Sequence, residues 1–442
     1  MMHADLLIQN ARLPDGRRNI AVVVEKGRIA AIGDPRDAHQ IKAREVIDAQ
    51  DYLLSPPFVD PHFHLDSALS YGQPRINESG TLLEGIELWG ELRPTLTIES
   101  VRERVRNLLS WSIARGTLAI RSHVDIGDPN LTAVHALIEV RESLKDLLDI
   151  QLVAFPQDGY LRNPGAARLL DRALELGVDV VGGIPHFERA KAEGDESVRL
   201  LCELAANKGL MVDMHCDESD DPHSRHIETL ASQTVRLGLE GRVTGSHVTA
   251  MHSMDNYYVS KLLPLLRDAD LSIISNPLIN LCLQGRHDNY PRRRGLTRIK
   301  ELLDAGINLA LGHDCVMDPW YPLGSHDMLE VAHMAVHGAP MTSLAQMRDL
   351  YDAVTIRGAA AMNLKDYGLA VGNPAHFVIL QARTPLEAIR LRPARLFVVR
   401  AGQVISRTPP VYADVAMGEK THAVDFCFEE PAERANLKKM RP

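Results

Sequence analysis

The chain has 442 residues, of which 45% are hydrophobic and 24% are charged, a balance typical of soluble globular proteins. Its net charge of −9, with 49 Lys and Arg against 58 Asp and Glu, provides no basic surface for nucleic acid. No apolar run is long enough to span a bilayer, and the five scattered Cys lack a CxxC pair, which is typical of reduced thiols in a cytoplasmic protein. We therefore expect a cytoplasmic protein with neither nucleic acid nor membrane as a partner.

Short apolar runs broken by turn residues occupy both ends of the chain. The runs are DLLIQNARL, NIAVVVEKGRIAAIG and AREVIDAQDYLLSP near the start, and PAHFVILQA and ARLFVVRAGQVIS near the end. The two ends also echo each other, since VVVEKGRIAAIG resembles LFVVRAGQVIS. The sequence therefore predicts one small β-sandwich domain built from residues 1–57 and 371–442.

Between these ends, short apolar runs alternate with segments of helical spacing. The eight runs are SPPFVDPHFHLD, TLAIRSHVD, IQLVAFPQD, VDVVGGIPHFE, LMVDMHCDE, GRVTGSHVTAM, LSIISNPLIN and INLALGHDC. AARLLDRALELG, SVRLLCELAANKG and LTRIKELLDAG are predicted helices between them. This alternation predicts a parallel sheet, and eight units over residues 58–370 fit a (β/α)8 TIM barrel with long loops.

The ends of the apolar runs favour a barrel over a doubly wound sheet. Seven of the eight runs carry His, Gln, Asp or Glu at or near their carboxyl end. A doubly wound sheet would explain the alternation but not this pattern, whereas in a barrel the carboxyl ends of all strands converge on the active site.

Several of these strand ends carry residues that bind metals. His62 and His64 are two apart in PHFHLD, so on a strand both side chains point to the same face. His215 ends the fifth run, His247 the sixth and Asp314 the eighth. Each residue alone could be a hydrogen-bonded core residue of a barrel without a metal. Their joint placement at one barrel end predicts a metal site.

Seven longer motifs show a resemblance to a known family. The His-x-His of strand one, the His of strands five and six and the Asp of strand eight resemble the amidohydrolase superfamily. PPFVDPHFHLD, SGTLLEGIELW, VAFPQDG, IPHFE, HCDE, NPLINLCLQGR and GHDCVMDPWYPLG are similar to bacterial cytosine deaminases. The resemblance covers essentially the whole chain. One departure is Cys315, where that family normally has a second Asp.

The resemblance implies one divalent transition metal per chain, Zn²⁺ or Fe²⁺. Its ligands would be His62, His64, His215 and Asp314, and imidazole nitrogens suit both metals. Binuclear relatives bridge two ions with a carboxylated Lys on strand four, but here that run ends GGIPHFE without a Lys. Lys191 follows in a polar segment and is expected to be solvated.

The resemblance also implies the catalytic roles. Asp314 would both bind the metal and accept a proton from water, and His247 would hydrogen-bond the attacking oxygen. Glu218, three residues after His215, would protonate N3 of the ring before ammonia leaves. The alternative for Glu218 is a solvent-facing loop acid, the role expected for its neighbours Asp217, Asp220 and Asp221.

Four further residues are candidates for substrate binding. The amide of Gln157 can donate and accept at once, which matches the N1/O2 edge of a pyrimidine, although a strand-end Gln can also bond backbone. Leu82 resembles a loop residue whose backbone contacts the base. Trp320 resembles a pocket wall, with a core aromatic as the alternative. Cys315 would lie beside C5 of the ring, where a small uncharged side chain leaves room for a methyl group.

Together these features predict a hydrolytic deaminase of a free pyrimidine base, cytosine and/or 5-methylcytosine, yielding uracil or thymine plus ammonia. The alternatives are a deaminase of another amino-substituted ring, such as isoguanine or creatinine, and a non-catalytic barrel used as a structural subunit. A cyclic-amide hydrolase is disfavoured by the missing Lys on strand four. A small nucleobase substrate and a homo-oligomer are the expected partners.

Overall fold

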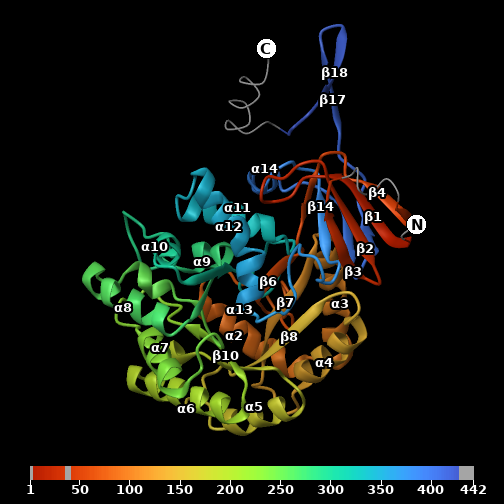
Figure 1. Ribbon diagram of the computed structural model, residues 1–442. Coiled ribbons are helices and arrows are strands. Elements are labelled where there is room, and N and C mark those ends of the chain that lie inside the picture. The colour runs from red at the N-terminus through yellow and green to blue at the C-terminus, as the bar shows by residue number, and fades with distance from the viewer. Residues whose placement is uncertain (1–2, 35–40, 428–442) are drawn as a thin grey trace. The chain divides into compact units, whose positions relative to one another are not determined.

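The computed structural model describes residues 3–34 and 41–427, and the chain forms two compact units (Figure 1). One unit comprises residues 1–56 together with 368–442, and the other comprises residues 57–367. The domain boundaries expected from the sequence, after residues 57 and 370, stay a prediction. The part of the expected tail that follows Cys427 lies outside the described residues.

The terminal unit contains two four-stranded sheets, with strand orders β3-β2-β1-β4 and β16-β15-β14-β5, and a separate hairpin. Its strands are β1 (His3–Ala11), β2 (Ile20–Glu25), β3 (Arg28–Gly33), β4 (Lys42–Asp48), β5 (Leu53–Ser55), β14 (Phe377–Leu380), β15 (Arg395–Arg400), β16 (Gln403–Arg407), β17 (Ala413–Met417) and β18 (Lys420–Val424). The described part of the unit also includes helix α14 (Pro385–Leu391). Both chain ends thus build one small β domain, as the sequence predicts.

Alternation along β1 explains how the two sheets pack. Leu6 and Ile8 point into the same core as Leu54 and Phe377 of the second sheet. Leu7 points to the opposite face, as expected for a strand with a side-chain period of two. The core of this unit therefore lies between its two sheets.

The second unit is a parallel eight-stranded barrel whose strands follow one another in chain order. The strands are β6 (Phe58–Phe63), β7 (Thr117–Asp125), β8 (Asp149–Phe155), β9 (Val180–Gly183), β10 (Met211–Cys216), β11 (Val243–His247), β12 (Ser272–Ser275) and β13 (Asn308–Leu311). Each of the eight predicted runs contains one of them. All nine residues of β7 are buried, as expected for a strand covered on both faces. The predicted (β/α)8 barrel is confirmed.

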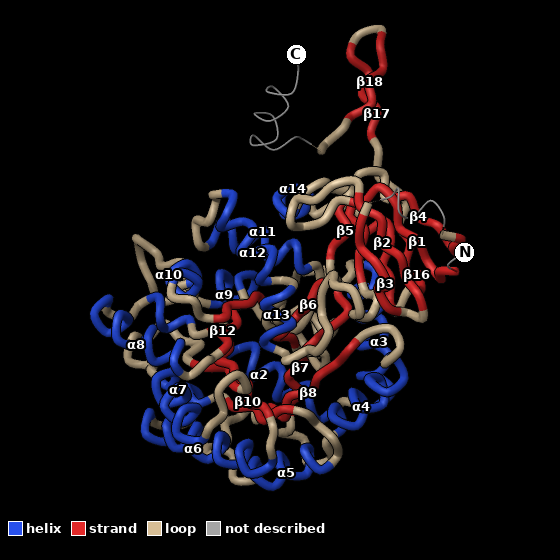
Figure 2. Tube along the Cα trace, in the orientation of Figure 1, coloured by secondary structure: helices blue, strands red, loops and turns tan. Residues whose placement is uncertain are grey.

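Helices surround these strands, as Figure 2 shows. They are α2 (Leu82–Leu92), α3 (Ile98–Ala114), α4 (Thr132–Leu144), α5 (Ala166–Glu175), α6 (Lys191–Lys208), α7 (His226–Leu237), α8 (Asn256–Asp268), α9 (Pro277–Leu283), α10 (Ile299–Asp304), α11 (Met328–Gly338), α12 (Leu344–Ala353) and α13 (Ile356–Ala361). Helix α10 is shorter than the predicted segment LTRIKELLDAG. The guanidinium of the preceding residue, Arg298, donates hydrogen bonds to the carbonyls of Met251 and Met254.

The barrel closes between its first and last strands through a few hydrogen bonds. Phe63 and Asp314 form an isolated parallel bridge. The Asp314 amide donates to the carbonyl of His62, and the His64 amide donates to the carbonyl of Asp314, both at 3.0 Å. The barrel seam therefore joins two segments that carry predicted metal ligands.

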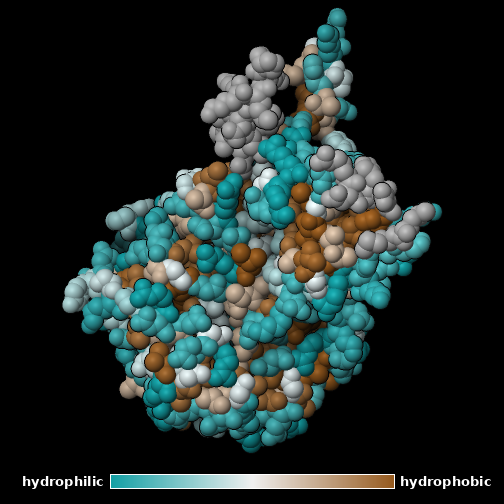
Figure 3. All heavy atoms as spheres, in the orientation of Figure 1, coloured by the Kyte–Doolittle hydropathy of each residue, from teal (hydrophilic) through white to brown (hydrophobic). Residues whose placement is uncertain are grey.

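The exposed surface agrees with the composition. Figure 3 shows hydrophilic residues over most of the visible face, with hydrophobic residues scattered among them. Within the described part of the chain, no helix has the length and apolar character needed to cross a membrane.

Candidate active site

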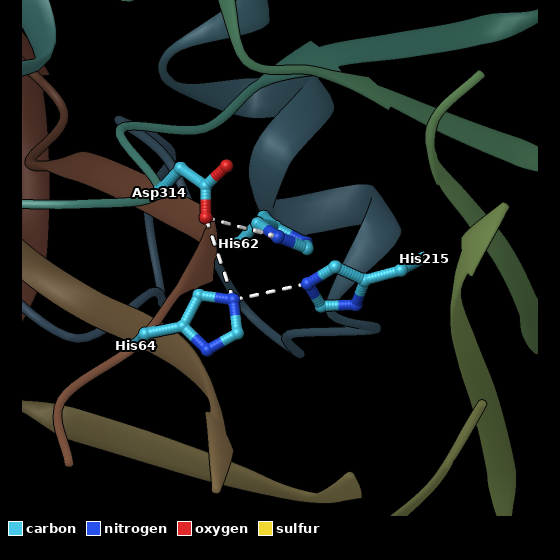
Figure 4. Close-up of side chains that lie close together, drawn as sticks. All are labelled: His62, His64, His215 and Asp314. Atoms are coloured by element: carbon cyan, nitrogen blue, oxygen red, sulfur yellow. Dashed lines mark hydrogen bonds and ion pairs between the residues drawn. The ribbon is translucent and has the colours of Figure 1, made fainter. Parts of the chain in front are cut away.

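Three imidazoles and one carboxylate meet inside the carboxyl end of the barrel (Figure 4). His62 lies on β6 and His215 on β10, His64 directly follows β6, and Asp314 lies three residues after the last residue of β13. Nε2 of His62 and Nε2 of His64 each lie 3.4 Å from Oδ1 of Asp314, and Nε2 of His64 lies 3.0 Å from Nε2 of His215. The structure thus brings together all four residues that the sequence singles out as metal ligands.

The spacing and chemistry of this group fit a metal ion. The four ligand atoms all lie within 4.8 Å of one another, and all four residues are buried. Ligands about 2.0–2.1 Å from a tetrahedral zinc are about 3.3 Å apart, close to the observed separations. Apart from the 3.4 Å approach of Nε2 to Asp314, neither ring nitrogen of His62 has a hydrogen-bond partner among the described residues, although an unpaired buried nitrogen is costly. A bound cation would satisfy it.

Protonation in the site also suits metal binding, which needs neutral imidazoles and an ionised carboxylate. Burial lowers the pKa of His64 to about 4 and holds the pKa of His215 well below its usual value. Burial opposes ionisation of Asp314, but the facing imidazoles of His62 and His247 outweigh it and lower its pKa. His62 is the exception: the carboxylate raises its pKa against the effect of burial, so metal binding at His62 would displace a proton.

Two of the site residues have unusual backbone conformations. Asp314 has a φ of 71° and His247 a φ of 69°, a region that residues other than glycine seldom adopt. Such conformations cost about 1–3 kcal/mol each and concentrate at functional sites. Here they turn both side chains at the ends of β13 and β11, so that Nε2 of His247 lies 3.7 Å from Oδ2 of Asp314.

Glu218 lies next to His247 at the same end of the barrel. Its Oε1 is 3.4 Å from Nδ1 of His247 and accepts a hydrogen bond of 3.2 Å from Nδ2 of Asn280. Burial, together with the negative charge of Asp314, raises the pKa of Glu218 well above its usual value. Both effects favour the acid form of the carboxyl group, which can donate a proton. Glu218 is only 6% exposed, so the alternative of a solvent-facing acid is wrong.

Asp217 differs from the expectation that it is solvated. It is completely buried, and its carboxylate accepts hydrogen bonds from Oγ of Ser224, the amides of His226 and Ile227, and Nδ1 of His226. These donors anchor the loop that carries Glu218. Asp221 is exposed, as expected.

A cavity next to the four-residue cluster contains every residue predicted to bind substrate. Its lining consists of His64, Leu82, Gln157, Ile184, His215, Glu218, His247, Ile279, Leu283, Asp314, Cys315 and Trp320. Leu82 is the first residue of α2, and Gln157 follows β8 and is 6% exposed. The arrangement is a small pocket with polar groups on the metal side and apolar groups elsewhere, typical of a site for a small ring.

Cys315 occupies this pocket as a neutral thiol. Its Sγ lies 3.7 Å from Oδ1 of Asp314, and the residue is 4% exposed. Burial, reinforced by the charges of Asp314 and Asp318, raises the pKa of the thiol well above its usual value. The side chain therefore presents a small uncharged surface to the pocket.

The sequence did not single out several residues that shape the site. Asn276 and Asn280 place their amide nitrogens 3.2 and 3.1 Å from Nδ1 of His247. Both belong to the seventh run and its motif NPLINLCLQGR, where their i,i+4 spacing was the available signal. The pocket is also lined by the apolar residues Ile184, Ile279 and Leu283, which the sequence does not distinguish from other core residues. Lys191 forms a surface ion pair with Asp195, as its polar context predicts.

The fold and the four-residue cluster define a metal-dependent barrel hydrolase. The chain belongs to the amidohydrolase family, whose sequence profile matches residues 45–412. The family and the His/Asp cluster together indicate a divalent metal.

Individual relatives include several deaminases. The crystal structure of 5-methylcytosine deaminase from Klebsiella pneumoniae liganded with 5-fluorocytosine is 42% identical, with a TM-score of 0.89, over 92% of this chain and 98% of that one. N-isopropylammelide isopropyl amidohydrolase from Pseudomonas sp. (strain ADP) is 28% identical over 92% of this chain and 99% of the relative. Pterin deaminase from Rhizobium rhizogenes is 30% identical over 83% and 84%, respectively.

Proposed function

We propose that this protein is a metal-dependent deaminase of a free pyrimidine base, which converts cytosine, 5-methylcytosine or both to uracil or thymine plus ammonia. One observation carries the proposal: a single pocket is lined by three of the four metal-ligand residues, by the buried carboxyl group of Glu218 and by the thiol of Cys315. The likeness to 5-methylcytosine deaminase at 42% identity supports the choice of base.

One divalent metal ion per chain, Zn²⁺ or Fe²⁺, would be held by His62, His64, His215 and Asp314. When bound, it supplies a Lewis acid that lowers the pKa of a water molecule towards neutrality. The absence of a Lys at the end of β9 supports one ion rather than two. Asp314 is placed to accept the proton of the attacking water, since its second oxygen faces His247 rather than the other imidazoles.

Proton transfer to the ring belongs to Glu218 in this proposal. Its raised pKa keeps the proton available for N3 when water adds to C4. After that transfer the carboxylate can take the next proton and pass it to the departing amine. His247, fixed between Asn276, Asn280 and Asp314, is placed to hydrogen-bond the attacking oxygen.

Three residues would fix the base in the pocket. The amide of Gln157 both donates and accepts, so it can pair with the N1/O2 edge. Leu82 would contribute backbone contact from the start of α2. Trp320 would form a flat wall on which the ring of the base can stack, since aromatic rings favour offset stacking.

Cys315 would decide between the two bases. We expect the wild type to accept 5-methylcytosine with a kcat/KM about 10–200-fold above that for cytosine, the discrimination that one methyl group in a matching pocket supports. In Cys315→Asp the ratio should fall strongly, because a buried carboxylate must be desolvated against the methyl group. The measurement is kcat/KM for both bases in the two proteins.

Cys315→Ala provides the matched control, since Ala is also small and uncharged and should keep the preference for 5-methylcytosine. Strong discrimination by the wild type against 5-methylcytosine would contradict the role of Cys315, as would an unchanged ratio in Cys315→Asp. Including isoguanine and creatinine in the same assay tests the alternative ring substrates. No turnover of any of these rings would favour the structural subunit, although all four ligands of a catalytic site are present.

A further inference from the structure

Helix α2 forms one wall of the pocket, and its buried face contains a glycine. Gly85, Leu88, Trp89 and Leu92 are the buried residues of this helix. A glycine inside a helix costs roughly 0.5–1 kcal/mol relative to alanine, so a buried one calls for a packing reason. Gly90, on the exposed side of the same helix, has no atom within 4 Å of the position a Cβ would take.

The packing reason at Gly85 is Trp320. A Cβ built on Gly85 would lie 2.2 Å from Cδ1, 2.4 Å from Nε1 and 2.8 Å from Cγ of that indole. Real Cβ atoms essentially never make contacts under 3.0 Å, and these atoms belong to a rigid ring rather than to the end of a flexible side chain. Any side chain at position 85 must therefore displace either the helix or the tryptophan.

Helix α2 is held more firmly in place than the side chain of Trp320. Nε1 of Trp89 donates a hydrogen bond of 2.7 Å to Oδ2 of Asp125, at the end of β7. Arg93, just after the helix, donates to the same oxygen at 2.8 Å and pairs with Asp158 at 2.8 Å. Asp125 is 4% exposed, so water screens these charge-assisted bonds little. They fix the helix to the barrel beside Gln157.

The indole of Trp320 is held less firmly than the helix. Its backbone amide donates to Oδ1 of Asp318 at 2.9 Å, but its Nε1 has no hydrogen-bond partner among the described residues. The ring lines the substrate pocket, and its centroid lies 6.4 Å from that of His64 and 6.3 Å from that of Trp89. Because α2 is fixed on one side of the ring and the pocket lies on the other, we expect a side chain at position 85 to push the indole towards the pocket.

We propose that Gly85 is a positioning residue for substrate binding: its missing side chain lets Trp320 lie back against α2 and leaves the pocket wide enough for a flat base. This role rests on the proposed function, because the pocket it shapes is the one assigned to the pyrimidine. Gly85 itself touches no substrate and acts through the indole.

The test compares Gly85→Ala with Gly90→Ala in the same helix, using the metal-loaded wild type as reference. Both substitutions add one methyl group and favour the helix. We expect Gly85→Ala to raise KM for the preferred base about 10–200-fold, the range for one methyl group in a pocket, with a smaller change in kcat. Gly90→Ala should leave KM, kcat and metal content unchanged and should raise Tm slightly, because alanine favours the helix.

A second comparison separates this role from general packing. Trp320→Ala removes the three ring atoms that a Cβ at position 85 would meet, so Gly85→Ala should cost little further KM when added to Trp320→Ala. The inference is overturned if the effects of the two substitutions on KM multiply instead. It is also overturned if Gly85→Ala and Gly90→Ala have the same KM. If Gly85→Ala does not fold, the double variant decides: it should recover solubility and metal content, and its failure to do so counts against the role.

The same assays keep the two proposals apart. A wild type that turns over neither cytosine nor 5-methylcytosine overturns the proposed function. A wild type that is active, paired with an unchanged KM in Gly85→Ala, overturns only the role of Gly85.

Discussion

Replacing His215 with Ala is expected to remove the bound metal and almost all activity together. The wild type should contain about one divalent metal ion per chain, and the variant close to none. The reason is that His215 contributes one of the four ligands of the cluster, with its Nε2 only 3.0 Å from that of His64. Elemental analysis of the purified proteins, run beside a deamination assay, measures both effects.

His223→Ala is the matched control for this experiment. His223 is an exposed imidazole in the loop that follows the same strand, so its removal should leave the metal content and the rate unchanged. A fully active wild type with two metal ions per chain would contradict the single-ion site. An active His215→Ala would contradict the ligand set itself.

The ligand cluster could be predicted from the sequence because it depends on short-range rules. Period-two geometry places His62 and His64 on one face, and the carboxyl ends of barrel strands converge wherever the strands lie in the chain. The barrel itself followed from alternating apolar runs and helical segments, and the small β domain from the echo between the two chain ends. The segment LTRIKELLDAG does form a helix, although only Ile299–Asp304 of it is helical.

The surroundings of the cluster were harder to predict, because they depend on contacts between distant segments. Asp217 and Asp221 belong to one acidic run, yet the first is buried by donors from α7 and the second is exposed. Nothing in the run itself separates them. Likewise, Gly85 lies on α2 and Trp320 on the loop after β13. The sequence around either residue does not predict their contact.

Glu218→Gln should keep the metal and bind substrate but lower kcat by roughly 10²–10⁴-fold, the usual contribution of general acid–base catalysis. Burial and the charge of Asp314 raise the pKa of Glu218, so the wild-type side chain carries the proton that N3 must receive. Gln has nearly the same size and can still accept the hydrogen bond from Asn280, but it has no proton to deliver. Single-turnover rates, with metal content measured on the same samples, separate the proton transfer from binding.

The pH dependence follows from the same group. Glu218 must be protonated to act as the acid, and its pKa is raised. The wild-type rate should therefore stay constant while the pH is below this raised pKa and should fall as the pH rises above it. Asp221→Asn removes an exposed carboxyl group from the same loop and should change neither kcat nor the alkaline fall. The decisive comparison is the profile of Glu218→Gln, which should be low throughout and lack the alkaline fall. A near-normal rate in that variant, with the wild-type fall intact, would show that a different group donates the proton to the ring.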